Sequence, residues 1–197
     1  MRRSVSRGFT LIELMIVIGL LAILIVFAAP SFVDTLDRRA VINATQALTG
    51  QIQQARSLAI TRNTTVSMVM TRTSGNNWCF GLTDAATCVC SVLDDEDDDA
   101  CTVGVPDNPD ERILIRADQT LFRGVELGDI GGTLTVSFEP TRGLRTDGGA
   151  TTIGDPDDLV TFQSPRGLET RVGVNRIGRI STCSPSGASL AGGIGPC

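Results

Sequence analysis

The sequence predicts an α+β fold in which one long N-terminal helix packs on an antiparallel β-sheet head. The N-terminal third of the chain combines an apolar run with helical periodicity. After it, apolar residues alternate with polar ones, and clusters of Gly, Pro and Asp separate these segments. A chain of 197 residues with 42% apolar content can bury one core and is short for two. We therefore expect a single head with appendages.

Residues 9–29 form an apolar segment that is long enough to cross a membrane. Thr10 and Glu13 are its only polar residues, and a helix of about 20 residues spans the hydrocarbon. Three arginines precede the segment, which places the N-terminus in the cytoplasm and the rest of the chain on the other side. A secretory signal peptide or a plain anchor would also account for the segment. Neither explains Glu13, because a carboxylate near the bilayer centre costs about 2 to 3 kcal/mol and usually has a partner.

The helix is predicted to continue past Pro30 to about residue 62. Polar residues in this region fall largely outside one narrow stripe of small and branched apolar side chains. The stripe follows the three-and-four spacing of one helical face, so we expect residues 30–62 to lie across a sheet. Its members are Val41, Ala44, Leu48, Ile52, Ala55 and Ala59.

Residues 63–197 are predicted to form the β-rich head. An acidic insert at about 83–111 interrupts its alternating pattern, and a tail at 183–197, closed by cysteines, ends the chain. The strands are expected to form one antiparallel sheet or two. They are predicted at 64–70, 78–82, 112–116, 124–127, 134–138, 159–163, 171–175 and 179–182.

Residues 7–13, Arg-Gly-Phe-Thr-Leu-Ile-Glu, resemble the class III signal of type IV prepilins and type II secretion pseudopilins. The resemblance implies that residues 1–8 are a leader, that a prepilin peptidase cuts after Gly8, and that Phe9 becomes a methylated N-terminus. It also implies that Glu13 pairs with the N-terminal amine of a neighbouring subunit during assembly. Pro30 matches the position at which helices of this family kink or locally melt, consistent with its missing N–H.

Two later segments resemble the GspH/FimT branch of minor pilins and type II secretion pseudopilins. They are the Phe-Glu-Pro-Thr-Arg-Gly turn at 138–143 and the final strand at 172–181. The resemblance implies the type IV pilin fold and a subunit that helps initiate or cap a type IV pilus or a type II secretion pseudopilus. Its partners would be the major subunit and other minor pilins or pseudopilins.

The same resemblance implies a location. The subunit would cross the bacterial inner membrane once, with its head in the periplasm, and would reach the tip of a pilus or pseudopilus after assembly. Nothing in the residues separates pilus biogenesis from protein secretion, because both machines use the same leader and the same apolar helix.

All six cysteines lie in the predicted head, on the oxidising side of the membrane, where an even number favours disulfides. We expect Cys183 to bond Cys197 and so to close the Gly-rich tail. In the insert, the two cysteines of the Cys-x-Cys pair are too close for an unstrained mutual bond, so each should reach one of the outer cysteines, in either order. A four-thiolate zinc site is the alternative, against which the spacing and the compartment argue. The insert cysteines are Cys79, Cys88, Cys90 and Cys101, of which the first and last are the outer ones.

The insert also contains an acidic run at 94–99. A solvated loop is the simpler interpretation. Clustered carboxylates suit calcium, but the run lacks the glycine and the terminal glutamate of an EF-hand loop. We expect no cofactor, with calcium at this loop as the alternative. The negative charge opposes the approach of DNA to this side of the head.

Residues 163–182 carry a local excess of positive charge in a chain whose formal net charge is -5. In FimT-like pilins a Gly-Arg-x-Arg segment is associated with capture of extracellular DNA. Gly178 and Arg179 match its first two positions, whereas Ser181 replaces its second arginine. This departure weakens the DNA interpretation, because phosphate affinity grows with the number of contacts. Pairing with acids of the head or of a neighbouring subunit is the alternative. The candidate DNA-binding residues are Arg166, Arg171, Arg176 and Arg179.

The composition also argues against catalysis. The chain has no His, Lys or Tyr, which removes the Ser/His/Asp and Cys/His arrangements of nucleophilic catalysis and any imidazole metal ligand. We predict that the protein is not an enzyme.

Overall fold

The computed structural model describes residues 9–73, 76–105, 108–146, 160–185 and 194–197, so the predicted leader at 1–8 lies outside the described residues. The chain divides into two compact units, residues 1–36 and residues 37–197. One helix, α1 (Leu11–Arg62), contributes to both. Its backbone is helical at Pro30, so local melting is not observed there, and the alternative of a kink stays a prediction.

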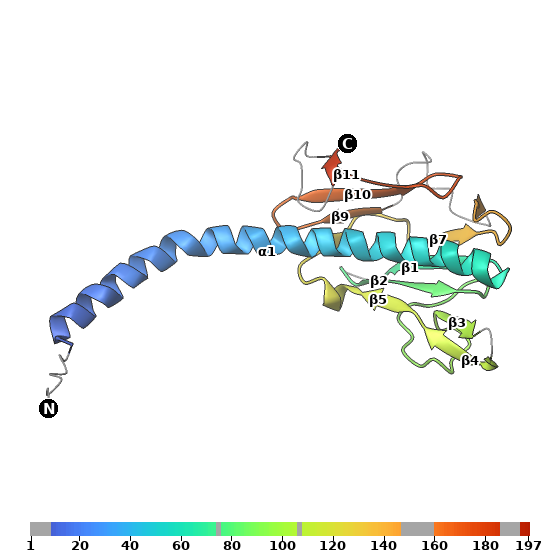
Figure 1. Cartoon of the computed structure of the whole chain (residues 1–197), viewed down its shortest axis with the longest axis horizontal. Coiled ribbons are helices and arrows are strands. Elements are labelled where there is room, and N and C mark those ends of the chain that lie inside the picture. The colour runs from blue at the N-terminus through green and yellow to red at the C-terminus, as the bar shows by residue number, and fades with distance from the viewer. Residues whose placement is uncertain (1–8, 74–75, 106–107, 147–159, 186–193) are drawn as a thin grey trace, which may run out of the picture. The chain divides into compact units, whose positions relative to one another are not determined.

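Among its described residues, the second unit contains two five-stranded sheets and a two-stranded hairpin (Figure 1). The first sheet has the strand order β5-β2-β1-β7-β8, and all its pairs are antiparallel. Its strands are β1 (Val66–Arg72), β2 (Trp78–Thr83), β5 (Arg116–Asp118), β7 (Thr133–Phe138) and β8 (Arg145–Thr146).

The second sheet has the order β12-β11-β10-β9-β6, in which only the β11–β12 pair is parallel. The separate hairpin, formed by β3 and β4, lies in the predicted insert. The strands of the second sheet are β6 (Glu126–Leu127), β9 (Val160–Gln163), β10 (Glu169–Val174), β11 (Ile180–Ser184) and β12 (Gly195–Pro196). The hairpin strands are β3 (Thr102–Val105) and β4 (Asn108–Leu114), and a 3-10 turn, η1 (Gln119–Leu121), follows β5.

The core lies between the C-terminal part of α1 and the two sheets. Every member of the predicted apolar stripe is buried there, because the three-and-four spacing keeps these side chains on one face of the helix. The core contains an aromatic group in which Trp78 lies beside Phe80 and Phe162 of the sheets and beside Phe122, which follows η1. The Trp78 indole N–H donates to the Val125 carbonyl at 3.1 Å, so its polar atom is satisfied. The predicted α+β fold, a helix packed on antiparallel sheets, is confirmed.

One buried polar contact joins α1 to the second sheet. The hydroxyls of Thr45 on α1 and Thr170 on β10 lie 2.7 Å apart, and both residues are buried. The Thr45 hydroxyl also donates to the Val41 carbonyl at 2.8 Å. Because a hydroxyl carries one proton, Thr45 accepts from Thr170.

The strand predictions differ from the structure where strands are short or bent. The predicted strand at 112–116 is divided into β4 and β5 by Ile115, whose N–H donates to Cys101 and whose carbonyl accepts from Leu82. The predicted strand at 124–127 is reduced to β6. The strands β3, β8 and β12 were not predicted, because they are too short or too polar to show an alternating pattern.

Candidate functional site

The described part of the N-terminal segment begins at Phe9, whose side chain is 79% exposed. Glu13 lies in the first turn of α1, where its N–H donates to the Thr10 hydroxyl at 3.3 Å. Glu13 and the apolar side chains around it, at 11–25, are exposed. Residues 11–25 therefore present an exposed apolar helical surface with the Glu13 carboxylate near its start. Gly8 and the side chain of Pro30 lie outside the described residues.

Within the described part of the chain, no helix has both the length and the apolar character that a membrane span requires.

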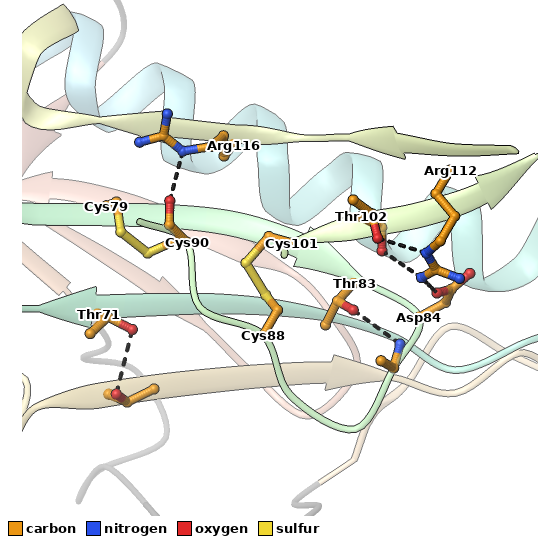
Figure 2. Close-up of a disulfide and its surroundings, with 12 residues drawn as sticks. Thr71, Cys79, Thr83, Asp84, Cys88, Cys90, Cys101, Thr102, Arg112 and Arg116 are labelled. Carbon is orange, nitrogen blue, oxygen red and sulfur yellow. Dashed lines mark hydrogen bonds and ion pairs between the residues drawn. A yellow bond between two sulfur atoms is a disulfide. The ribbon is translucent and has the colours of Figure 1, made fainter. Parts of the chain in front are cut away.

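Two disulfides hold the insert, and the first of them ties it to β2 of the first sheet (Figure 2). Cys79 bonds Cys90 and Cys88 bonds Cys101, with Cα–Cα distances of 5.7 and 5.0 Å. This is one of the two arrangements that the sequence left open. The four cysteines and Val69 of β1 form a buried cluster. Since neighbouring residues of a strand point to opposite faces, the cluster covers the face of the sheet that is turned away from α1.

The third disulfide closes the tail as predicted. Cys183 bonds Cys197 with a Cα–Cα distance of 4.9 Å. It ties β12 beside β11, where the Cys197 N–H donates to the Ser184 carbonyl at 3.1 Å. No cysteine is free, so the zinc alternative has no thiolate ligands in this oxidised state.

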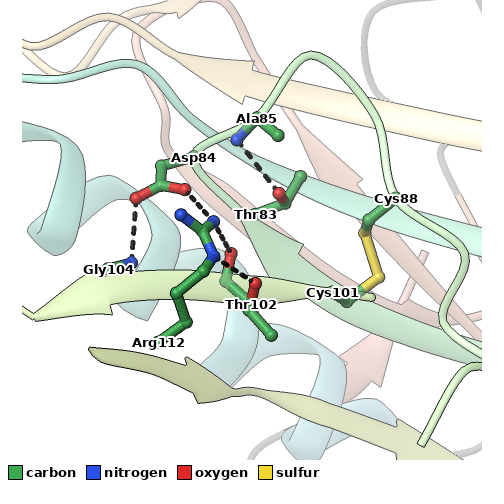
Figure 3. Close-up of polar contacts among 8 residues, drawn as sticks. All are labelled: Thr83, Asp84, Ala85, Cys88, Cys101, Thr102, Gly104 and Arg112. Atoms are coloured by element: carbon green, nitrogen blue, oxygen red, sulfur yellow. Dashed lines mark hydrogen bonds and ion pairs between the residues drawn. A yellow bond between two sulfur atoms is a disulfide. The ribbon is translucent and has the colours of Figure 1, made fainter. Parts of the chain in front are cut away.

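A charged network closes the base of the insert (Figure 3). The Arg112 guanidinium lies 2.6 Å from the Asp84 carboxylate and donates to the Thr102 hydroxyl at 2.7 Å. The other Asp84 oxygen accepts from the Gly104 N–H at 3.0 Å. Burial acts to raise the pKa of Asp84, but the hydrogen bonds from Gly104 and Arg112 and the Arg112 charge outweigh it, and the pKa is lowered from its ordinary value. Asp84 is therefore ionised at neutral pH and holds the insert at its start.

The acidic run at 94–99 forms tight surface turns. Asp94 accepts from the Glu96 N–H at 3.1 Å, and Asp97 accepts from the Asp99 N–H at 2.9 Å. Part of the run lines an open depression of about 620 Å³. Within the described residues, no group of three or more Asp, Glu, Cys or His side chains is arranged to hold a metal ion. The expectation of no cofactor, with calcium at this loop as its alternative, stays a prediction.

The four candidate DNA-binding arginines do not form one patch. Arg166 lies in the β9–β10 turn, 3.4 Å from the carboxylate of Asp37. Arg171 lies within β10, whereas Arg176 and Arg179 lie in the β10–β11 turn, and both are exposed. The two turns are at opposite ends of β10, and a six-residue strand is about 20 Å long. Only Arg176 and Arg179 are therefore near neighbours.

The β10–β11 turn is built around Asn175 and Gly178. The Asn175 N–H donates to the Arg179 carbonyl at 3.1 Å, and its side-chain oxygen accepts from the Arg179 N–H at 2.8 Å. Gly178 has a φ of 74°, a left-handed conformation that glycine adopts without strain. A Cβ there would lie 3.1 Å from Arg56 Nε, so the turn rests on an arginine of α1.

Two arginines that the sequence analysis did not group with this turn lie against it. Arg56 donates from Nη1 to the Gly178 carbonyl at 3.3 Å, and Arg145 of β8 donates from Nη1 to the Val174 carbonyl at 2.9 Å. The Nε of each is buried and has no hydrogen-bond partner among the described residues. One sequence feature could have indicated that Arg56 faces the head: it lies four residues after Ile52, next to the apolar stripe of the helix.

The Phe-Glu-Pro-Thr-Arg-Gly turn at 138–143 reaches the same place. Gly143 has a φ of 62°, and a Cβ there would lie 2.7 Å from Ile60 Cδ1 and 3.0 Å from Arg56 Nε. Both segments that resemble the GspH/FimT branch therefore meet at Arg56 of α1.

Comparison with known families identifies the chain at this point. A family model described as Type II transport protein GspH matches residues 44–178, which is more than half of the sequence. The chain belongs to the GspH family. A second model, the prokaryotic N-terminal methylation motif, matches residues 3–29. Neither the curated proteins nor the solved structures that were searched gave a match.

The GspH match begins on the buried stripe of α1 and ends at Gly178, so it covers the part of the head that meets at Arg56. Proteins of the GspH family are structural rather than catalytic subunits. Together with the methylation motif, membership supports a pilin or pseudopilin role in type II secretion or in a pilus. It implies contacts with other pilins or pseudopilins, processing by a prepilin peptidase, and an inner-membrane location with a periplasmic head.

Proposed function

We propose that this GspH-family subunit is a minor pilin or pseudopilin that helps initiate or cap the assembly of a type IV pilus or a type II secretion pseudopilus. The observation that carries the proposal is the exposed apolar helix at 11–25, which has Glu13 in its first turn and lies within the match to the methylation motif. An exposed apolar surface of this extent is a site for lipid or for other subunits. The head adds a compact, disulfide-tied body with which neighbouring subunits can pack.

In this proposal the prepilin peptidase cuts after Gly8, and the amine of Phe9 is methylated. Before assembly, residues 9–29 cross the inner membrane once and the head lies in the periplasm. In the filament, Glu13 pairs with the N-terminal amine of a neighbouring minor pilin, pseudopilin or major subunit. That ion pair removes the cost of an isolated carboxylate among apolar side chains.

The proposal is tested by a clean deletion in the native host, scored in parallel for surface pili and for exoproteins trapped in the periplasm. Lost pili with normal secretion would assign the subunit to a type IV pilus, and trapped exoproteins with normal pili would assign it to type II secretion. Because an initiating subunit acts once per filament, we expect few filaments of normal length rather than many short ones. Normal pili together with normal secretion would contradict the proposal, provided that deletion of the major subunit gives the expected defect.

A second candidate function, DNA capture for natural transformation, is favoured by one observation. The exposed Arg176 and Arg179 lie on one turn, with Arg56 and Arg145 directly behind them. Arginine guanidinium groups bind phosphate in forked geometry. The acidic net charge of the chain and the ion pair of Arg166 with Asp37 count against a wide DNA surface.

For DNA capture, we expect the purified full-length protein in detergent to retain duplex DNA at low salt. The double variant Arg176→Ala with Arg179→Ala should lower the slope of log affinity against log salt by about 2, since each phosphate contact contributes about 0.9. Arg166→Ala is the matched control, because this arginine already lies beside Asp37. Fluorescence anisotropy over a salt series measures the slope, and absence of binding at low salt would remove this candidate.

A further inference from the structure

The two disulfides of the insert cross each other in the sequence. Cys79 bonds Cys90 and Cys88 bonds Cys101, so the first cysteine of the second bond lies between the two cysteines of the first. The tail disulfide, by contrast, joins two consecutive cysteines. The head therefore combines one crossed pair of bonds with one bond between neighbours in the order of cysteines.

The unfolded chain does not select the crossed pairs. The two native bonds have sequence separations of 11 and 13 residues. In the uncrossed alternative, Cys79 bonds Cys88 and Cys90 bonds Cys101, with separations of 9 and 11 residues. Because loop-closure entropy grows only slowly with loop length, the alternative is favoured by less than about twofold. Oxidation before folding should therefore give both pairings in comparable amounts.

The folded insert accepts only the crossed pairs. The Val89 N–H donates to the Asp99 carbonyl at 2.7 Å. The Cys90 carbonyl accepts from Arg116 Nε at 2.6 Å (Figure 2). These hydrogen bonds fix the backbone of residues 88–90, so that its two cysteines face different partners. The uncrossed pairing would need each of these cysteines to move to the place of the other, which breaks both hydrogen bonds.

Closure of the insert also hides its disulfides. All four cysteines are at most 5% exposed, and they form a buried cluster with Val69. Thiol–disulfide exchange requires the attacking thiolate to reach a sulfur atom. The native bonds are out of reach once the insert is closed, so mispaired bonds have to be exchanged before that point. The tail bond stays accessible, since Cys183 is half-buried and Cys197 is exposed.

We propose that the insert is a substrate of a thiol–disulfide isomerase, which exchanges mispaired bonds before the insert closes on the first sheet. The isomerase thiolate attacks Cys88 of a Cys79–Cys88 bond, which forms a mixed disulfide and releases the Cys79 thiolate. That thiolate attacks Cys90, forms the Cys79–Cys90 bond and releases the Cys101 thiolate. Attack of Cys101 on the mixed disulfide then forms the Cys88–Cys101 bond and returns the isomerase thiolate, so no electrons are gained or lost overall.

This inference goes beyond the proposed function, because it concerns how the head is made and not what the head contacts in a filament. The partner is defined by its chemistry, a reactive thiolate that acts on the open insert in the oxidising compartment where the cysteines pair. A deletion strain without an assembly defect would leave this inference intact, and failure of this inference would leave the assembly role intact.

Two double variants serve as matched controls. Cys88→Ala with Cys101→Ala leaves the other insert bond and the tail bond, each between consecutive cysteines, so correct pairing should no longer need an isomerase. Cys183→Ala with Cys197→Ala removes the accessible tail bond and keeps the crossed pair, so it should need the isomerase as the unaltered protein does. Peptide mapping reads the pairing of the remaining cysteines whether or not a variant reaches full stability.

The test starts from reduced full-length protein, unfolded in urea, diluted into detergent with the thiol oxidant diamide and analysed by non-reducing peptide mapping. After oxidation alone, we expect about half of the molecules to carry the uncrossed bonds. Purified protein disulfide isomerase, the probe, should then restore the native bonds at least about tenfold faster than buffer alone. An isomerase without its second active-site cysteine should be trapped as a mixed disulfide on the unaltered protein and on the tail variant, but not on the Cys88→Ala/Cys101→Ala variant.

Three outcomes would overturn the inference. Exclusively native bonds in the unaltered protein after oxidation alone would mean that the fold selects the pairs before they oxidise. An equal mispaired fraction in the Cys88→Ala/Cys101→Ala variant would mean that crossing is not the cause of mispairing. Uncrossed bonds that persist in the presence of the isomerase would mean that the open insert is not its substrate.

Discussion

Gly81→Ala is expected to lower the stability of the head by about 3 kcal/mol, the upper end of the range for overpacking a core. A Cβ at Gly81 would lie 2.6 Å from Cys101 Cβ, 2.9 Å from Cys101 Sγ and 2.9 Å from the Ile115 carbonyl. Neither neighbour can move easily, because Cys101 is bonded to Cys88 and the Ile115 carbonyl accepts from the Leu82 N–H at 2.9 Å. For a chain of this size, the melting temperature should fall by about 6 to 12 °C.

The effect is measured by thermal unfolding of the full-length protein under non-reducing conditions, with circular dichroism as the signal. Gly50→Ala is the stability control, since the same methyl group meets nothing within 4 Å there and the residue lies within α1. We expect the control to raise stability by about 0.5 to 1 kcal/mol, because alanine favours helix over glycine. Equal melting temperatures for the two variants would show that the Cys88–Cys101 bond does not cross β2 at Gly81.

Glu13→Gln is expected to abolish incorporation into filaments while leaving membrane insertion intact. Glutamine keeps the shape of the side chain but removes its charge, so the proposed ion pair with a neighbouring N-terminal amine cannot form. Insertion should persist because loss of a charge lowers the cost of placing residues 9–29 in hydrocarbon. Immunoblots of sheared filaments and of membrane fractions measure the two steps separately.

Two controls accompany the Glu13 prediction. Glu13→Asp retains the charge on a shorter side chain and should retain part of the assembly. Gln54→Ala changes an exposed residue of α1 outside the apolar segment and should behave like the unaltered protein. Wild-type incorporation of Glu13→Gln would refute the proposed pairing and leave only apolar contacts to drive assembly.

The long helix and its packing face could be predicted because both are local features of the sequence. A stripe that repeats every three and four residues specifies a helical face whatever lies opposite it. The six members of the stripe, from Val41 to Ala59, are buried as expected. The short strands could not be predicted in this way. β8 and β12 have two residues each, too few to show an alternating pattern, and they are defined only by their pairing with Phe138 and Ser184.

The arginines of the candidate DNA-binding site also show that local sequence patterns do not predict contacts between distant segments. Arg166 and Arg176 are ten residues apart in the sequence, but β10 runs between them and separates their turns, so a count of local charge placed them in one patch wrongly. Arg56 is more than a hundred residues from Gly178 and still donates to its carbonyl. Contacts of this kind depend on which loops meet at the end of α1, and composition and periodicity contain no information about that.

The Thr45–Thr170 hydroxyl pair has a mechanical consequence. Its partners lie in an otherwise apolar contact between α1 and β10, which by itself would tolerate displacement of the helix along its axis. A shift by one turn, about 5.4 Å, would separate the two hydroxyls. Thr45 would keep its hydrogen bond to the Val41 carbonyl, but the Thr170 hydroxyl would lose its acceptor, at a cost of about 1 to 3 kcal/mol. The pair therefore fixes the axial position of α1 on β10. When a force pulls on the helix, β10 and the rest of the head move with it, and the helix does not slide along the sheet.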